Sequence, residues 1–244
     1  EKARAQNPVA DFYKDKTITI AIGFPAGGEY DLHGRLVGRF IGKHIPGNPQ
    51  VIVSQMTGAG GITAANHLYN VAPKDGTHLA IIANGVATAQ AIGTKGIAFD
   101  AGKLNWIGAL VPTIEVMVMW HTSGVRSLED VKAKEYVIGA SGRGAGSYIM
   151  PMVLKEMFDA KLKIVSGYRG GADLNVAMER GETAGRSNSW TSWKTTKAHW
   201  LKEKTIVPIA YAGPEAKDLP GVPRLNTLAK SPEDRQVLDL IFSG

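Results

Sequence analysis

Residues 23–31 read GFPAGGEYD and follow directly on the apolar run TITIAI at residues 17–22. The run is rich in β-branched residues, which predicts a buried strand. Proline and two glycines then end it, and Asp31 stands where the N-cap of a following helix is expected. Leu32, Leu36 and Phe40 recur beyond it on one face of that helix. The stretch therefore predicts a strand, a glycine turn and a helix in succession.

Two further glycine-rich turns occupy the same place between a predicted strand and a predicted helix. The second spans Thr57 to Gly61, and the third spans Ser141 to Ser147. The first N–H groups of a helix lack partners inside the helix, and the helix dipole adds partial positive charge there. Glycine lets an anion approach this backbone closely. Tight turns in any α/β protein need the same residues, so each turn alone leaves both interpretations open.

Short β-like runs alternate with helical patterns along the whole chain, which predicts an α/β fold with mostly parallel strands. Domain crossings are expected near residues 108–112 and 202–205. Residues 11–109 and 205–244 would then form a discontinuous first domain, and residues 110–204 an inserted second domain. The expected strands are 17–22, 50–54, 78–82, 104–109, 116–120, 136–140, 162–166 and 205–210. The expected helices are 31–44, 61–71, 128–133, 147–158, 172–180 and 233–242.

Composition narrows the class of protein. The chain has 244 residues, 44% of them hydrophobic, which suffices for a sizeable core. It contains no cysteine, so disulfides, thiol catalysis and cysteine-based zinc sites are excluded. The net charge is +6, but the basic residues are scattered, which argues against nucleic acid and mildly favours small anionic ligands.

No recognisable catalytic pattern is present in the sequence. There is no G-x-S-x-G turn, and the six histidines show no metal-ligand spacing. Gly58-Ala59-Gly60 begins like a dinucleotide-binding turn, but Thr63 replaces its third glycine and no P-loop occurs. We therefore expect a binding protein without cofactor or metal, rather than an enzyme. An NAD(P)-dependent oxidoreductase with an irregular glycine loop is the alternative, and a ligand sensor without a transport role is a second one.

Several motifs in one order resemble those of the substrate-binding proteins of tripartite tricarboxylate transporters, also called Bug proteins. The resemblance covers nearly the whole chain. It rests on FPAGG at 24–28 with Asp31, GAGG at 58–61, APKDGT at 72–77, the loop 141–147, YRGGA at 168–172 and LPGVP at 219–223.

The resemblance implies a two-domain periplasmic binding protein of the Venus-flytrap, type II-like kind, each domain a mostly parallel sheet flanked by helices. Such a protein captures a small organic carboxylate between its domains and delivers it to membrane transporter subunits. The first loop would hold the carboxylate, the second would line the same side, and the third would close from the opposite domain. The expected ligand-binding residues are Phe24, Pro25, Ala26, Gly27, Gly28, Tyr30, Asp31, Thr57, Ala59, Gly60, Ser141, Arg143, Gly144, Gly146, Ser147 and Asp173.

Some features depart from the family pattern. Ala26 stands where a second proline is usual, Arg143 is positioned to pair with a second carboxylate, and Glu29 favours a ligand carrying an amine. Family members continue some tens of residues further, so the C-terminal part of the first domain is expected to be missing. Ala3-Arg4-Ala5 has the form of a signal-peptidase site. It predicts that residues 1–10 are a flexible leader left by export to the periplasm.

Overall fold

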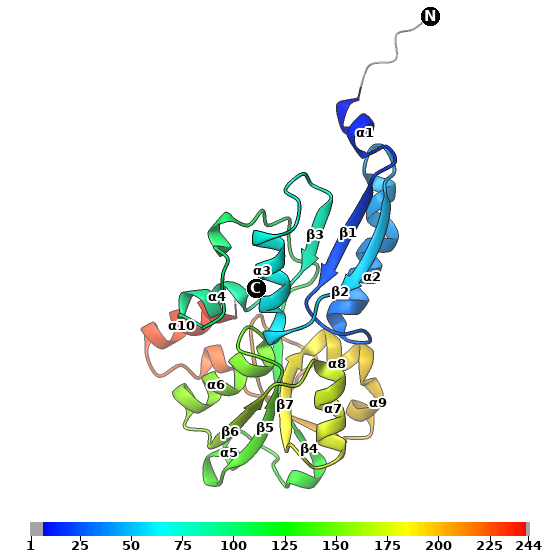
Figure 1. Cartoon of the computed structure of the whole chain (residues 1–244). Helices are drawn as coiled ribbons and strands as arrows, with labels where there is room; N and C mark the ends of the chain where they lie inside the picture. Colours follow the sequence, from blue (N-terminus) through cyan, green and yellow to red (C-terminus); the bar gives the residue numbers. More distant parts are fainter. Residues whose placement is uncertain (1–6, 243–244) are drawn as a thin grey trace, which may run out of the picture.

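The chain forms two β-sheets in a computed structural model that describes residues 7–242. The first sheet is parallel, in the order β2-β1-β3, and the second is mixed, in the order β6-β5-β7-β4-β8. We call the part built on the first sheet the first half and the part built on the second sheet the second half. In Figure 1 the first half lies above the second half. The strands are β1 Thr17–Ile22, β2 Gln50–Gln55, β3 His78–Ile81, β4 Glu115–Trp120, β5 Tyr136–Ala140, β6 Leu162–Ser166, β7 Gly185–Ser189 and β8 Ile206–Ala212.

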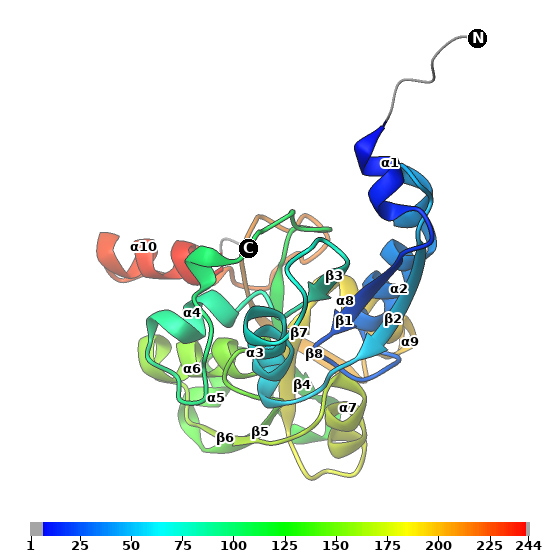
Figure 2. The same cartoon turned by 45° about the horizontal axis from the view of Figure 1, so that its top comes forward.

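Helices flank both sheets, and short 3-10 turns join several elements (Figure 2). The helices are α1 Pro8–Tyr13, α2 Glu29–Phe40, α3 Ile62–Asn70, α4 Val86–Ala91, α5 Asp130–Ala133, α6 Gly146–Phe158, α7 Gly171–Glu179, α8 Trp190–Thr196, α9 Ala198–Lys202 and α10 Pro232–Ile241.

Strand β4 shows why the second sheet is covered on both faces. Successive side chains of a strand point to opposite faces. Met117 and Met119 accordingly pack with residues of α6 and β5, while Val116 and Val118 pack with tryptophans of α8 and α9. Because both faces are buried, the strand reads as the continuous apolar run VMVMW.

Helix α2 packs on the first sheet through its small residues rather than its large apolar ones. A Cβ on Gly34 would lie 2.4 Å from Cδ1 of Ile22, so a larger residue at this position would have to displace that buried side chain. The apolar stripe expected from the sequence points away from the sheet: Leu32 is 49% exposed and Leu36 is 54% exposed. The N-cap of α2 is Gly28, so the expectation that Asp31 is the N-cap is corrected.

The C-terminal part of the chain belongs with the second sheet. Strand β8 pairs antiparallel with β4, and Leu238 of α10 is buried in the same core as Met150 and Ile209. The expected return of residues 205–244 to the first domain is therefore wrong for the strand and helix seen here. The division of the chain into domains otherwise stays a prediction.

Other local expectations also need correction. Residues 104–109 form no strand but an extended connector in which Trp106 is 56% exposed. Strand β7 and helices α1, α4, α8 and α9 were not expected. Residues 8–10 lie in α1, which corrects the expected flexible leader over that part, and residues 1–6 lie outside the described residues.

Candidate functional site

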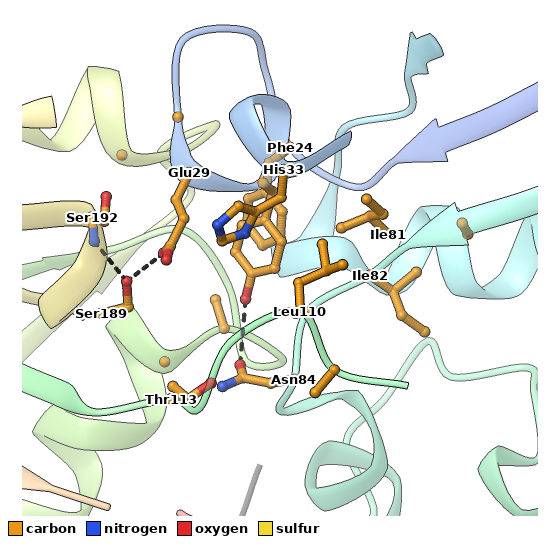
Figure 3. A pocket seen from close by; sticks show the side chains of 18 of the residues that line it. Phe24, Glu29, His33, Ile81, Ile82, Asn84, Leu110, Thr113, Ser189 and Ser192 are labelled. Atoms are coloured by element: carbon orange, nitrogen blue, oxygen red, sulfur yellow. Dashed lines mark hydrogen bonds between the residues drawn. The ribbon is translucent and has the colours of Figure 1, made fainter. Parts of the chain in front are cut away.

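A cavity of about 1500 Å³ opens between the two halves. Its apolar side is formed by the end of β3 and the connector 104–112, including Ile81, Ile82 and Leu110. Its polar side carries Glu29 and Ser189, which face each other in Figure 3. An apolar cleft with a few convergent polar groups is the usual form of a small-ligand site.

The start of α2 reaches this cavity through the turn Pro25 to Gly28. Asp31 fixes the turn, because its carboxylate accepts a hydrogen bond from Gly27 N at 3.0 Å. The same carboxylate accepts from Arg35 Nε at 3.0 Å and from Gln55 Nε2 at 2.8 Å. Burial raises the pKa of Asp31, but these hydrogen bonds outweigh it and hold the pKa below its ordinary value. Asp31 therefore positions the turn and does not line the cavity.

The start of α7 lies against that same turn from the other half. A Cβ on Gly170 would lie 2.8 Å from the ring carbons Cγ and Cδ of Pro25. Neither Gly28, the N-cap of α2, nor Gly170, the N-cap of α7, has a side-chain cap. Gly28 and Gly171 both line the cavity. Two positive helix ends, one from each half, thus open onto one space.

The second loop contacts the third loop and does not line the large cavity. The positive φ of Gly60, +67°, turns its backbone toward Gly142, where a Cβ would lie 2.5 Å from Gly60 N. This contact leaves no room for a ligand between the two backbones. Beside it lies a smaller cavity of about 340 Å³. Its lining includes Thr57, Ala59 and Arg143.

The start of α6 faces a carboxylate of the protein itself. A Cβ on Gly146 would lie 2.6 Å from Oε2 of Glu115, so the side chain of Glu115 occupies the end of this helix. Ser147 Oγ accepts from Ser141 N at 3.1 Å and lies 3.0 Å from Ser141 Oγ, which fixes the loop before α6. A ligand anion at α6 would meet Glu115, in contrast to the expectation for the third loop.

Glu115 is buried at the first position of β4, with 5% of its surface exposed. Its Oε1 has no hydrogen-bond partner. Burial raises the pKa of Glu115 to about 7; the nearby carboxylate of Glu29 adds to the rise, while Ser187 and Arg186 oppose it. Glu29 accepts a hydrogen bond from Ser189 Oγ.

Arg186 of β7 is the buried cation of the second half. It donates to Asn175 Oδ1 at 2.7 Å and to the carbonyl of Gly171 at 3.1 Å, and its guanidinium lies 4.8 Å from the ring centre of Trp193. Burial lowers the pKa of Arg186 to about 10. Its hydrogen bond to Gly171 ties the start of α7 to the sheet and adds positive potential there.

Phe24 and Tyr30 form an aromatic pair beside these groups, with ring centres 4.3 Å apart and nearly parallel planes. The Tyr30 hydroxyl donates to Asn84 Oδ1 at 3.3 Å. Burial, and then the carboxylates of Glu115 and Glu29, raise the pKa of Tyr30. Its hydroxyl therefore stays protonated at neutral pH.

The structure brings together only part of the expected site. The expected residues that line the large cavity are Phe24, Pro25, Ala26, Gly27, Gly28, Tyr30, Ser141, Gly146 and Ser147. Those that do not are Asp31, Thr57, Ala59, Gly60, Arg143, Gly144 and Asp173. Asp173 pairs with Arg169 at 2.8 Å, and Arg143 stacks on Tyr148. A direct role of these residues in ligand binding stays a prediction.

Sequence reasoning missed Glu115, Arg186 and Ser189. A signal for Glu115 was present, because a carboxylate at the head of the buried run VMVMW must be buried with it. Arg186 and Ser189 lie in the polar strand GRSNS, which shows no apolar alternation. Trp190 and Trp193 pack in the core beside α9.

Metal-binding clusters and membrane-spanning helices are both absent from residues 7–242. No group of three metal-ligating side chains is present in this part of the chain. No helix within it has the length and apolar character required to cross a membrane.

The two halves and the cleft between them have the fold of two-domain periplasmic binding proteins. A model of the NMT1-like family matches residues 22–187, more than half of the chain, and the chain belongs to this family. A search of curated proteins found no significant match.

Solved structures agree with this fold. One described as a periplasmic transporter has 21% identity and a TM-score of 0.76, over 92% of this chain and 75% of that one. MatC from Rhodopseudomonas palustris, solved with malate, has 21% identity and a TM-score of 0.75, over 89% and 74%. The periplasmic binding protein BugD has 17% identity and a TM-score of 0.71, over 88% and 72%. The resemblance read from the sequence motifs is thereby confirmed.

Proposed function

We propose that this protein captures a small organic carboxylate in the cleft between its halves. The observation that carries the proposal is the meeting of two uncapped helix ends, of α2 and α7, beside one cavity. Their free N–H groups and dipoles neutralise an anion without a buried countercharge. The malate bound to the similar MatC belongs to the same chemical class.

Capture would involve closure of the two halves around the ligand. Pro25 of the first half already touches Gly170 of the second, and Gly60 touches Gly142. A ligand held by both α2 and α7 favours this closed arrangement, because its contacts are lost when the halves separate. The protein binds and releases its ligand without chemical change, and it needs neither cofactor nor metal for this.

A thermal-shift screen tests the proposal, with mono- and dicarboxylic acids, amino acids and NAD(P) as ligands. A carboxylate at about 100 times its dissociation constant is expected to stabilise the protein by about 2.7 kcal/mol. Stabilisation by NAD(P) and by no carboxylate would favour the oxidoreductase alternative instead. Calorimetric titration of each hit then gives stoichiometry, expected to be one ligand per chain.

We further propose that the protein works in the periplasm and hands its ligand to membrane subunits of a tripartite tricarboxylate-type transporter. The Bug-type fold supports this role. Cells that lack the protein should lose high-affinity uptake of the ligand found by calorimetry. Unchanged uptake, with ligand-dependent gene expression lost instead, would point to the sensor alternative. Cell fractionation tests the location.

A further inference from the structure

Two carboxylates meet on one wall of the cleft. Glu115 and Ser189 are direct neighbours across the β4–β7 ladder, and Ser189 donates a hydrogen bond to Glu29. The carboxylate of Glu29, from the first half, is thereby brought next to Glu115, from the second. Both line the cavity, and Figure 3 shows the side chain of Glu29 directed at Ser189.

Neither carboxylate forms an ion pair within the described residues, and Oε1 of Glu115 accepts no hydrogen bond there. Arg186 is close enough to affect both, but its donors are directed to Asn175, Gly171 and Ser187. A buried carboxylate without an ion-pair partner is costly, and a second carboxylate beside it increases the cost.

A further hydrogen-bond acceptor, the hydroxyl oxygen of Tyr30, lies beside the pair. The Tyr30 hydroxyl donates its hydrogen bond to Asn84 Oδ1, so the lone pairs of the hydroxyl oxygen remain free to accept a hydrogen bond. A ligand carboxylate placed here would be repelled by Glu29 and Glu115. An ammonium group, with three N–H donors and a positive charge, matches both carboxylates.

We propose that Glu29 and Glu115 together hold a cationic group of the ligand, so that the cleft selects a zwitterion of the amino-acid type. The ligand's carboxylate lies at the starts of α2 and α7, and its ammonium lies between the two glutamates. This inference rests on the proposed function, since it names the second pole of the same ligand. It also explains why the carboxylate of Glu115, and not that of the ligand, lies at the start of α6.

Matched ligand pairs test the proposal by calorimetry at pH 8. The pairs are L-aspartate with succinate, L-glutamate with glutarate, and L-alanine with propionate. In at least one pair the aminated member is expected to bind about tenfold or more tightly, the usual size of a charge-assisted contact. Equal or tighter binding of the plain acids would overturn the ammonium site and leave carboxylate capture standing. Binding by no acid of either kind would overturn both.

The variants Glu115→Gln and Glu29→Gln locate the effect. Each is expected to weaken the aminated ligand about tenfold and to leave the plain acid unchanged or tighter. Glu156→Gln, an exposed carboxylate on α6 outside the cavity, should keep wild-type affinities for both members. Equal losses for both members of a pair would contradict the assignment. Thermal denaturation checks that each variant folds. If Glu115→Gln does not fold, the affinities of Glu29→Gln, which is changed at the more accessible position, decide the question.

Discussion

The buried carboxyl of Glu115 makes the stability of the protein depend on pH. Burial raises its pKa from the ordinary 4.5 to about 7, so the folded state holds this proton more tightly than the unfolded state does. The free energy of unfolding should therefore fall as pH rises from about 4.5 to about 7, by on the order of 3 kcal/mol from this group. The carboxylate of Glu29 adds to the rise in the pKa of Glu115, while the hydrogen bond from Ser187 and the charge of Arg186 oppose it.

Urea unfolding of the ligand-free protein at pH 5 and pH 8 measures this effect. Wild type should lose more stability between the two pH values than Glu115→Gln, whose amide cannot ionise. Glu156→Gln should follow wild type, because that side chain is exposed. Parallel pH profiles for wild type and Glu115→Gln would show that Glu115 titrates normally.

The guanidinium of Arg186 is held by geometry as well as charge. Its Nη1 donates hydrogen bonds to Asn175 Oδ1 and to the carbonyl of Gly171, and the guanidinium stacks on the ring of Trp193. Lysine keeps the charge, but its ammonium group cannot reproduce the planar arrangement of these hydrogen bonds or the stacking on Trp193. We expect Arg186→Lys to lower the free energy of unfolding by about 2–3 kcal/mol, measured by urea denaturation. Arg180→Lys, at an exposed position, should change it by less than about 0.5 kcal/mol; similar losses for both would contradict this role.

At the scale of elements, the contact between the loops before α3 and α6 fixes how the halves meet. A methyl group on Gly142 would lie 2.5 Å from Gly60 N and 2.6 Å from Ala59 C. Backbone atoms cannot yield as a side chain does, so Gly142→Ala should separate the loops. We expect a loss of about 1–3 kcal/mol in stability and weaker carboxylate binding, measured by urea unfolding and calorimetry. Gly102→Ala is the control, since its Cβ would meet only Asp100 Oδ1 at 3.4 Å, and an equal effect there would refute the argument.

The elements also show where sequence patterns suffice. Strands β1, β5 and β6 lie at the expected residues, because short apolar runs rich in β-branched residues between turns predict strands. The connector 104–109 has a similar pattern but pairs with no strand in the described part of the chain, and its apolar side chains face the cavity or solvent. Strand β7 was missed because GRSNS is polar and shows no apolar alternation.

At the scale of the whole molecule, the partners of each glycine loop could not be predicted. The sequence identifies three loops of similar chemistry, and the fold pairs the first with the start of α7 and the second with the third. Local propensity contains no information on which loops meet across a cleft. The exposed stripe of α2 has the same cause, since Gly34 and Gly38 determine which face approaches the sheet.

The field of the whole chain should influence how fast a ligand arrives. The net charge is +6, which attracts anions over distances comparable to the Debye length. That length is about 30 Å at 0.01 M salt and about 8 Å at 0.15 M. Stopped-flow association rates of succinate should therefore fall over this range of salt, while its dissociation rate changes little. A zwitterion without net charge, such as L-alanine, should show a much weaker dependence. Equal salt dependence for the two ligands would mean that local contacts, and not the overall field, govern their capture.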